Sequence, residues 1–363
     1  MATQTTVGWI LDVSHDYNTG DINLLIKLQD GKLISFIQRL QEYLFYVLPK
    51  SYQAGQDLYQ QLSKNDQLIK RIFWDEKYID LQDKTKTSLI AISLDSNDRQ
   101  DFKILIQKLG HDSRVKSLYN IDLSSVMQFI FIQLKIAPTS KVKIEYDDNA
   151  EQLLSIAKID GSQELTLPPF SVMYIEALNE TSVNKNELLK LSVTTNGQDS
   201  TTLAVNSLSD AVLVSNISQN NPDIIVLFGD FHNYKDFTEL FKQNVIISTR
   251  DAVSDNDIVE LVEKSRFSYL PLRFSSKYGM IRLIDSRITF ELLQRDFVIP
   301  ARLKTVSKHH EQVRTLENIV KLDKAGMIIS PEIGLHKNVA VLDFNDEYAN
   351  IITRNNISYE NIS

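Results

Sequence analysis

The residue best placed for metal chemistry lies near the end of the sequence. Asp343 directly follows the apolar run 339–342, which is too short for a core helix and therefore predicts a buried strand. A strand that ends on a carboxylate can hold a metal ligand rigidly in place. Phe344 and Tyr348 follow, and Ile351 and Ile352 then indicate the beginning of a helix. Taken alone, Asp343 could equally end the strand or cap that helix.

Length and composition set the class of the molecule. The chain has 363 residues, 43% of them hydrophobic and 24% charged, as in a globular protein of two or three domains. No apolar run approaches the ~20 residues of a membrane span, and the amino terminus lacks a signal-peptide pattern. We therefore expect a cytoplasmic protein without a membrane partner.

Charge and residue counts exclude several kinds of site. The chain has no cysteine, which excludes disulfides, thiolate zinc sites and cysteine nucleophiles. Its six histidines are scattered and show no metal-binding spacing. A net charge of −8 argues against coating nucleic acid through bulk charge, but it leaves room for a local basic groove.

The first part of the chain has the pattern of an α+β unit. A short antiparallel sheet needs a covering layer, which two helical stretches at 55–63 and 98–109 are expected to supply. Either Asp122 or Ser124 suits the N-cap of a further amphipathic helix at 124–134. The expected strands are 9–13, 22–28, 33–36, 43–47 and 89–94, with a hairpin turn at Asp30 and Gly31.

The middle of the chain predicts an α/β region after a boundary. The polar residues 140–162 indicate that boundary, and strands alternate with helices beyond it. The expected elements are strands at 170–177, 188–194 and 222–228 and a helix at 208–216. Helical spacing of Ile281, Ile284, Ile288, Leu292 and Leu293 predicts a helix over 280–295. A further helix is expected at 305–324, ended by Ala325 and Gly326.

The end of the chain resembles motif A of the family B DNA polymerases. Asp343-Phe344, Tyr348, Ile351-Ile352 and Asn356-Ile357-Ser358 stand in the register of that motif, whereas 346–347 and 349–350 depart from it. Residues 8–47 and 118–134 are similar to the amino-terminal domain of the archaeal members. The resemblance implies that Asp343 binds the catalytic Mg²⁺ ions. It also implies that Phe344 and Tyr348 contribute to nucleotide binding, with Tyr348 excluding ribonucleotides.

The same resemblance implies a 3′→5′ exonuclease region whose acidic motifs are degenerate here. Tyr174 stands where the family has the first Asp of an Asp-x-Glu strand, and Glu176 is kept. Asp285 is kept in the third motif, and Asp230 or Asp236 is an uncertain third acid. Two-metal hydrolysis needs several convergent carboxylates, so we expect exonuclease activity to be lost.

The fold class that follows is a multidomain α+β and α/β protein. The resemblance implies a discontinuous, β-rich amino-terminal domain at 1–138 and 303–338. It also implies an RNase H-like, exonuclease-type domain at 139–302 and the beginning of a polymerase palm at 339–363.

The leading hypothesis is the amino-terminal part, or a subunit, of an archaeal family B DNA-directed DNA polymerase that acts in DNA replication. This nucleotidyltransferase would be inactive until a carboxy-terminal polymerase part supplied the remaining palm carboxylates. Its other expected partners are template–primer or single-stranded DNA and a sliding clamp. One alternative is a catalytically inactive polymerase-like module that binds DNA or acts as a scaffold. Another is a weak metal-dependent exonuclease that uses Glu176 and Asp285.

Overall fold

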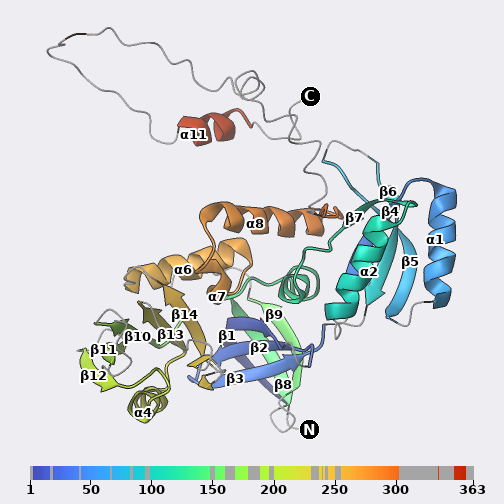
Figure 1. Cartoon of the computed structure of the whole chain (residues 1–363). Helices are drawn as coiled ribbons and strands as arrows, with labels where there is room; N and C mark the ends of the chain where they lie inside the picture. Colours follow the sequence, from blue (N-terminus) through green and yellow to red (C-terminus); the bar gives the residue numbers. More distant parts are fainter. Residues whose placement is uncertain are drawn as a thin grey trace.

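The computed structural model describes most of the chain up to Ala301 and a short helix near its end (Figure 1). The expected helix 305–324 and strand 339–342 lie outside the described residues, as do Asp343 and Phe344. The described residues are 3–16, 19–40, 42–65, 68–81, 85–94, 99–147, 152–159, 168–178, 189–195, 200–229, 237–238, 240–241, 244–249, 255–301, 334 and 347–356.

The first sheet is antiparallel, with the strand order β3-β2-β1-β8-β9. Its first three strands confirm the sequence prediction: β1 (Thr3–His15), β2 (Ile22–Leu28) and β3 (Leu33–Gln38). The expected turn joins β2 to β3, and Gly31 adopts φ 91° there, in the region that glycine enters without strain.

Strands β8 (Lys141–Asp147) and β9 (Gln152–Lys158) correct the expectation of a polar boundary at 140–162. β8 pairs with β1 from Thr3↔Asp147 to Trp9↔Lys141, and β9 pairs with β8 at the edge of the sheet. Most residues of β9 are exposed, so polar side chains suit a strand in this position.

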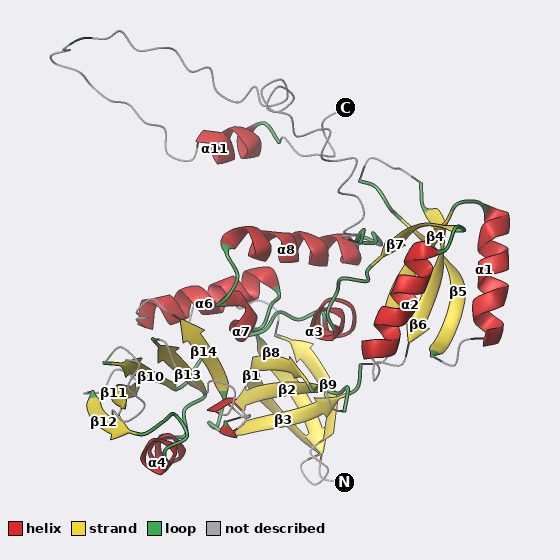
Figure 2. Ribbon diagram, viewed as in Figure 1, coloured by secondary structure: helices red, strands yellow, loops and turns green. Residues whose placement is uncertain are grey.

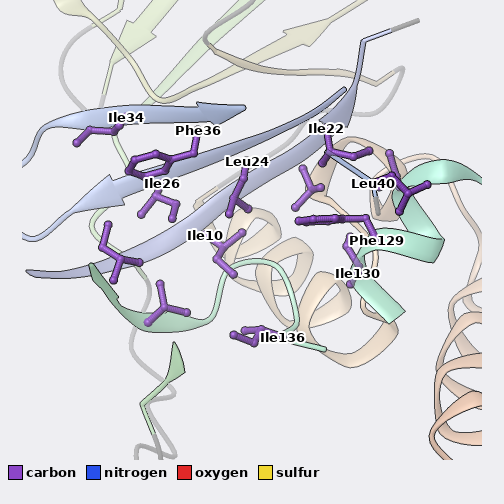
Figure 3. Packing of buried hydrophobic residues seen from close by; sticks show 14 of the residues in the cluster. Ile10, Ile22, Leu24, Ile26, Ile34, Phe36, Leu40, Phe129, Ile130 and Ile136 are labelled. Atoms are coloured by element: carbon purple, nitrogen blue, oxygen red, sulfur yellow. The ribbon is translucent and has the colours of Figure 1, made fainter. Parts of the chain in front are cut away.

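One face of the first sheet is covered by a helical segment, α3 (Ser125–Gln128) followed by the π-helix η1 (Phe129–Leu134). The Ser124 hydroxyl accepts a hydrogen bond from the Met127 N–H at 3.2 Å, so Ser124 rather than Asp122 is the N-cap. Figure 3 shows the buried side chains gathered between the strands and this segment, among them Ile10, Leu24 and Phe129.

The second sheet belongs to a β-α-β-β-α-β unit with the strand order β5-β6-β4-β7, a ferredoxin-like arrangement. The expected helices pack on this sheet through Leu58 and Leu105 rather than on the first sheet, which corrects the prediction. The edge strand β5 was not predicted from the sequence, because its charged residues break the apolar pattern. The elements are β4 (Tyr43–Pro49), α1 (Tyr52–Asn65), β5 (Ile69–Lys77), β6 (Thr87–Leu94), α2 (Arg99–His111) and β7 (Val115–Tyr119).

The third sheet has the order β12-β11-β10-β13-β14 and both strand directions. The strand β10 (Val172–Ala177) is parallel to β13 (Ile224–Phe228), as expected, and antiparallel to β11 (Leu189–Thr195). Helix α4 packs on one face and α6 on the other, which is the α/β arrangement predicted for this region. The remaining elements are β12 (Thr201–Val205), α4 (Ala211–Asn220), β14 (Val245–Thr249) and α6 (Asp255–Ser268).

The first sheet shares a buried core with the third sheet, and it forms one ion pair with the segment before β13 and one with α7 (Leu272–Ser275). Leu11 and Leu25 on the outer face of the first sheet belong to the same cluster as apolar residues of β10, β13, β14 and α6. Lys27 Nζ lies 2.8 Å from Asp223 Oδ1, and Arg273 lies 2.6 Å from Asp12. The centre of the first sheet is therefore buried on both faces.

The last helices of the described body are α7 (Leu272–Ser275) and α8 (Met280–Gln294), and α11 (Glu347–Arg354) lies apart from them (Figure 2). Helix α8 confirms the predicted helix. Its buried residues are Leu283, Ser286 and Phe290, whereas Ile281, Ile284 and Ile288 are exposed. Among the described residues, no helix has the length and apolar character that crossing a membrane requires.

Candidate functional site

The first exonuclease-type residues lie on β10. Tyr174 and Glu176 are two residues apart and so face the same side of the third sheet. Tyr174 packs at the edge of the core that includes α6, whereas Glu176 is exposed. Glu176 pairs in register with Phe228, so it lies at the carboxyl ends of the parallel strands. In α/β folds this edge is where ligands bind.

The chain turns sharply at this edge after β13. Gly229 adopts φ 120°, and a side-chain Cβ there would lie 3.0 Å from the Cβ of Ala177, at the end of β10. A residue with a side chain would be strained in this conformation. Asp230 and Asp236, the uncertain third acids of the exonuclease-type region, lie outside the described residues.

Asp285 is an exposed residue of α8, one layer away from the third sheet. Helix α8 packs against α6 and η1, and α6 in turn packs on the sheet. In Figure 1, α6 lies between α8 and the strands of that sheet. The structure thus brings Tyr174 and Glu176 to one face but places the helix of Asp285 elsewhere.

The described acids of this region do not by themselves make up a two-metal hydrolytic site. Such a site needs carboxylates that converge on a pair of ions about 3.5–4 Å apart. Across the residues that the structure describes, no three His, Cys, Asp or Glu side chains are grouped so that they could hold a metal ion. No hydrolytic step through a metal follows from this geometry.

The motif A-like stretch is described only from Glu347 onward. Tyr348 is 66% exposed on α11, and Ile351 and Ile352 are also exposed. The helix expected near these isoleucines is confirmed, although it begins earlier, at Glu347. A carboxylate in a first helical turn is favoured by the helix dipole.

Sequence reasoning did not find the buried ion pairs. The carboxyl group of Asp12 is buried, and this desolvation raises its pKa, against the lowering effect of the Arg273 guanidinium. Asp223 Oδ2 accepts hydrogen bonds from the N–H and the hydroxyl of Ser171, at 2.7 and 3.1 Å. The signal for the first pair was an acid inside an apolar strand, because a buried carboxylate requires a partner. The partner itself lies on a distant segment that no spacing rule indicates.

Comparisons with known proteins agree with the motif A-like stretch. The model of DNA polymerase family B matches residues 270–363, which include α8 and α11. DNA polymerase 2 of Saccharolobus solfataricus is 29% identical over 140 residues, which are 39% of this chain and 21% of the relative. The chain therefore spans about a fifth of the length of this curated relative.

A solved structure shows the same fold. The family B DNA polymerase from the hyperthermophilic archaeon Pyrobaculum calidifontis superimposes with a TM-score of 0.62 at 12% sequence identity. The similarity covers 82% of this chain and 52% of that polymerase. The chain is therefore similar to family B DNA polymerases in sequence over residues 270–363, and to the polymerase from Pyrobaculum calidifontis in fold.

Proposed function

We propose that the chain forms the amino-terminal part of a family B DNA-directed DNA polymerase. In this role it binds template–primer DNA and supplies Asp343 as a metal ligand for nucleotidyl transfer. The observation that carries the proposal is the position of Asp343 and Tyr348 inside the matched region 270–363. The chain spans about a fifth of its curated relative, and we propose polymerase activity for this chain only when a carboxy-terminal polymerase part completes it.

The proposed domains are the discontinuous amino-terminal domain at 1–138 and 303–338, the exonuclease-type domain at 139–302 and the palm segment from 339. The path of the chain after α8 supports the discontinuity. Val298 N–H donates to the Tyr78 carbonyl at 3.0 Å, and Ala301 N–H donates to the Leu118 carbonyl at 3.0 Å. The chain thus returns to the β-α-β-β-α-β unit. Because β8 and β9 belong to the first sheet, we move the first boundary from 138 to beyond Lys158.

Asp343 would hold a divalent cation together with carboxylates from the completing part. Family B polymerases use divalent metal ions, and hard carboxylate oxygens suit Mg²⁺. A two-metal site needs more than one carboxylate, and in this proposal the completing part supplies the second acid. Phe344 and Tyr348 would border the nucleotide, and the exposed Tyr348 ring would obstruct a ribose 2′-hydroxyl.

Exonuclease activity is proposed to be lost. Tyr174 replaces a carboxylate on β10, and α6 lies between the sheet and the helix of Asp285. With Mg²⁺ or Mn²⁺, the purified chain should leave single-stranded DNA at full length. Metal-dependent 3′→5′ degradation that disappears in Asp285→Ala would refute this part of the proposal.

The test of the main proposal is reconstitution. The full chain is mixed with a polypeptide carrying the remaining palm, fingers and thumb of a family B polymerase, and extension of a labelled primer is measured. Extension should require both polypeptides and should be lost in Asp343→Ala. Tyr348→Ala should retain extension and incorporate ribonucleotides, because its role is steric. If DNA binds but no extension occurs, the chain is instead an inactive DNA-binding module.

A further inference from the structure

The sheet of β4 to β7 has one face that its two helices leave open. Helices α1 and α2 pack on the other face through Leu58 and Leu105. On the open face, the pairing register places three aromatic residues in one row across the sheet: Phe73 on β5, Tyr46 on β4 and Tyr119 on β7. We call these residues the aromatic row. Four-stranded sheets that bind single-stranded RNA use aromatic residues on such a face to stack the bases.

Cationic side chains lie beside the aromatic row. The guanidinium of Arg71 lies 4.7 Å from the centre of the Phe73 ring, and the Arg71 side chain is 58% exposed. Lys77 follows on the same side of β5, because alternate residues of a strand share a face. Lys86 Nζ lies 5.5 Å from the centre of the Tyr78 ring. Rings together with cations suit a polynucleotide, since the rings stack on bases and the cations pair with phosphates.

A buried hydroxyl on this face lacks a partner. Ser93 of β6 is fully buried, and its Oγ forms no hydrogen bond with the part of the chain that the structure describes. Ser93 pairs in register with Arg71 on β5 and with Leu44 on β4, so it lies next to the aromatic row. Folded proteins satisfy most buried polar groups, and an unsatisfied one calls for an explanation. A polar ligand on this face can supply the missing partner.

A segment of the chain lies across the same face. We call residues 296–301 the crossing segment. At the β5 edge of the sheet, the Val298 N–H donates to the Tyr78 carbonyl at 3.0 Å. At the β7 edge, Pro300 forms an antiparallel bridge with Tyr119. Val298 is buried in the cluster that contains the aromatic row, so the crossing segment covers part of the face.

The crossing segment carries groups that resemble the parts of a nucleotide. The two carboxylate oxygens of Asp296 accept hydrogen bonds from Lys77 Nζ at 3.0 Å and from Lys86 Nζ at 2.9 Å. The ring of Phe297 lies against the ring of Tyr78, with centroids 5.0 Å apart. A carboxylate between two lysines takes the place that suits a phosphate, and a ring against a tyrosine takes the place that suits a base.

We propose that this face of the β4 to β7 sheet binds a single-stranded polynucleotide and that the crossing segment competes with it. Bases stack on Phe73 and Tyr78, and a phosphate replaces the Asp296 carboxylate between the two lysines. The inference goes beyond the proposed polymerase function, because the chain binds the strand by itself, whether or not Asp343 holds a metal.

Fluorescence anisotropy of labelled strands, measured with the full chain alone, tests the site. The probes are oligodeoxythymidylate and oligouridylate, which distinguish DNA from RNA as the source, and a DNA duplex of equal length. Phe73→Ala should weaken binding of the preferred strand about tenfold, because a stacking surface is lost. Arg71→Ala should reduce the slope of log affinity against log salt concentration by about 0.7, as expected for one lost phosphate contact.

The matched control for the cation is Lys108→Ala. Lys108 lies on α2, which covers the opposite face of the sheet, so its loss should change the affinity less than about twofold. Equal affinities of the wild type, Phe73→Ala and Arg71→Ala would overturn the proposal. Tighter binding of the duplex than of either single strand would also overturn it.

Asp296→Asn tests the competition. The change removes the carboxylate that holds Lys77 and Lys86, so the affinity for the strand should increase at least about threefold. The matched control is Glu291→Gln, which removes the acid paired with Arg287 on α8 and should change the affinity less than about twofold. Equal affinities of the two variants, or no binding by either the wild type or Asp296→Asn, would contradict the competing segment.

Discussion

Strand β1 and helix α8 both carry apolar residues on two sides. Both of these sides are buried in β1, but only one of them is buried in α8. Ile10 and Leu11 of β1 face opposite sides of the first sheet, and both are fully buried. On α8, Phe290 is buried while Ile281 is 78% exposed. Described elements cover both faces of β1 but only one face of α8. An apolar pattern therefore shows that a surface is to be covered, but not by which part of the chain.

The largest expected effect comes from the covered side of α8. Phe290→Ala removes a ring that stacks on Tyr269 with centroids 3.7 Å apart and meets Phe131 edge to face at 5.8 Å. The loss of this packing and the cavity left behind should cost about 3–5 kcal/mol of unfolding free energy. Urea unfolding measures it, with Val212→Ala as the exposed control, expected within about 0.5 kcal/mol of wild type. Equal losses in the two variants would show that the covered face of α8 is wrongly identified.

A slightly smaller effect is expected at the outer face of the first sheet. Arg273→Ala leaves the buried Asp12 carboxyl without its cation and should cost about 3 kcal/mol at neutral pH. Burial already raises the folded-state pKa of Asp12, and loss of the guanidinium raises it further. The folded state then binds the proton more tightly than the unfolded state. The destabilisation should therefore be small below pH 3.8 and grow as the pH rises.

The matched control for this pair lies on α8. Arg287 forms a pair with Glu291 at 2.6 Å on the helix surface, so Arg287→Ala should cost less than about 1 kcal/mol. Thermal unfolding of both variants between pH 3 and pH 8 separates the two cases. A pH-independent loss in Arg273→Ala would contradict the role of Asp12.

The smallest effect is expected where the chain leaves α8. Hydrogen bonds from Lys86 and Lys77 lower the pKa of Asp296 below its usual 3.8. The folded state thus favours the carboxylate, and the resulting stability is present above pH 3.8 and lost as the pH falls through the folded-state pKa. Asp296→Asn should cost less than about 1 kcal/mol at pH 7, because the pair is exposed, and almost nothing at pH 2. The difference in melting temperature between the wild type and Asp296→Asn is measured at pH 7 and at pH 2. An equal difference at the two pH values would exclude the effect.

Much of the fold could be predicted, because local patterns determine it. The strands β1 to β4, the turn at Gly31 and the helix α8 follow from alternation, turn chemistry and helical spacing. The sheet to which each strand belongs could not be predicted, since pairing joins distant segments. β8 illustrates this: its polar residues resemble a linker, yet its partner is β1, more than a hundred residues earlier.

The sequence indicated which residues could belong to the candidate sites, but it did not indicate how these residues are arranged in space. The register of β10 placed Tyr174 and Glu176 on one face, because alternate residues of a strand share a side. The separation of Asp285 depends on α6 packing between α8 and the sheet, and no short pattern in the sequence encodes that layer. Asp343 itself lies outside the described residues, so its metal-binding role stays a prediction.

The most direct test of the central claim is the ratio of two primer-extension rates in the reconstituted polymerase. Asp343→Ala removes the carboxylate in the motif A position, and Asp346→Ala removes another carboxylate three residues later in the same segment. A lost metal ligand costs several kcal/mol of transition-state stabilisation, so Asp343→Ala should be at least about a hundredfold slower than Asp346→Ala at saturating Mg²⁺. Equal extension rates for the two variants would contradict the assignment of Asp343 and, with it, the proposed function.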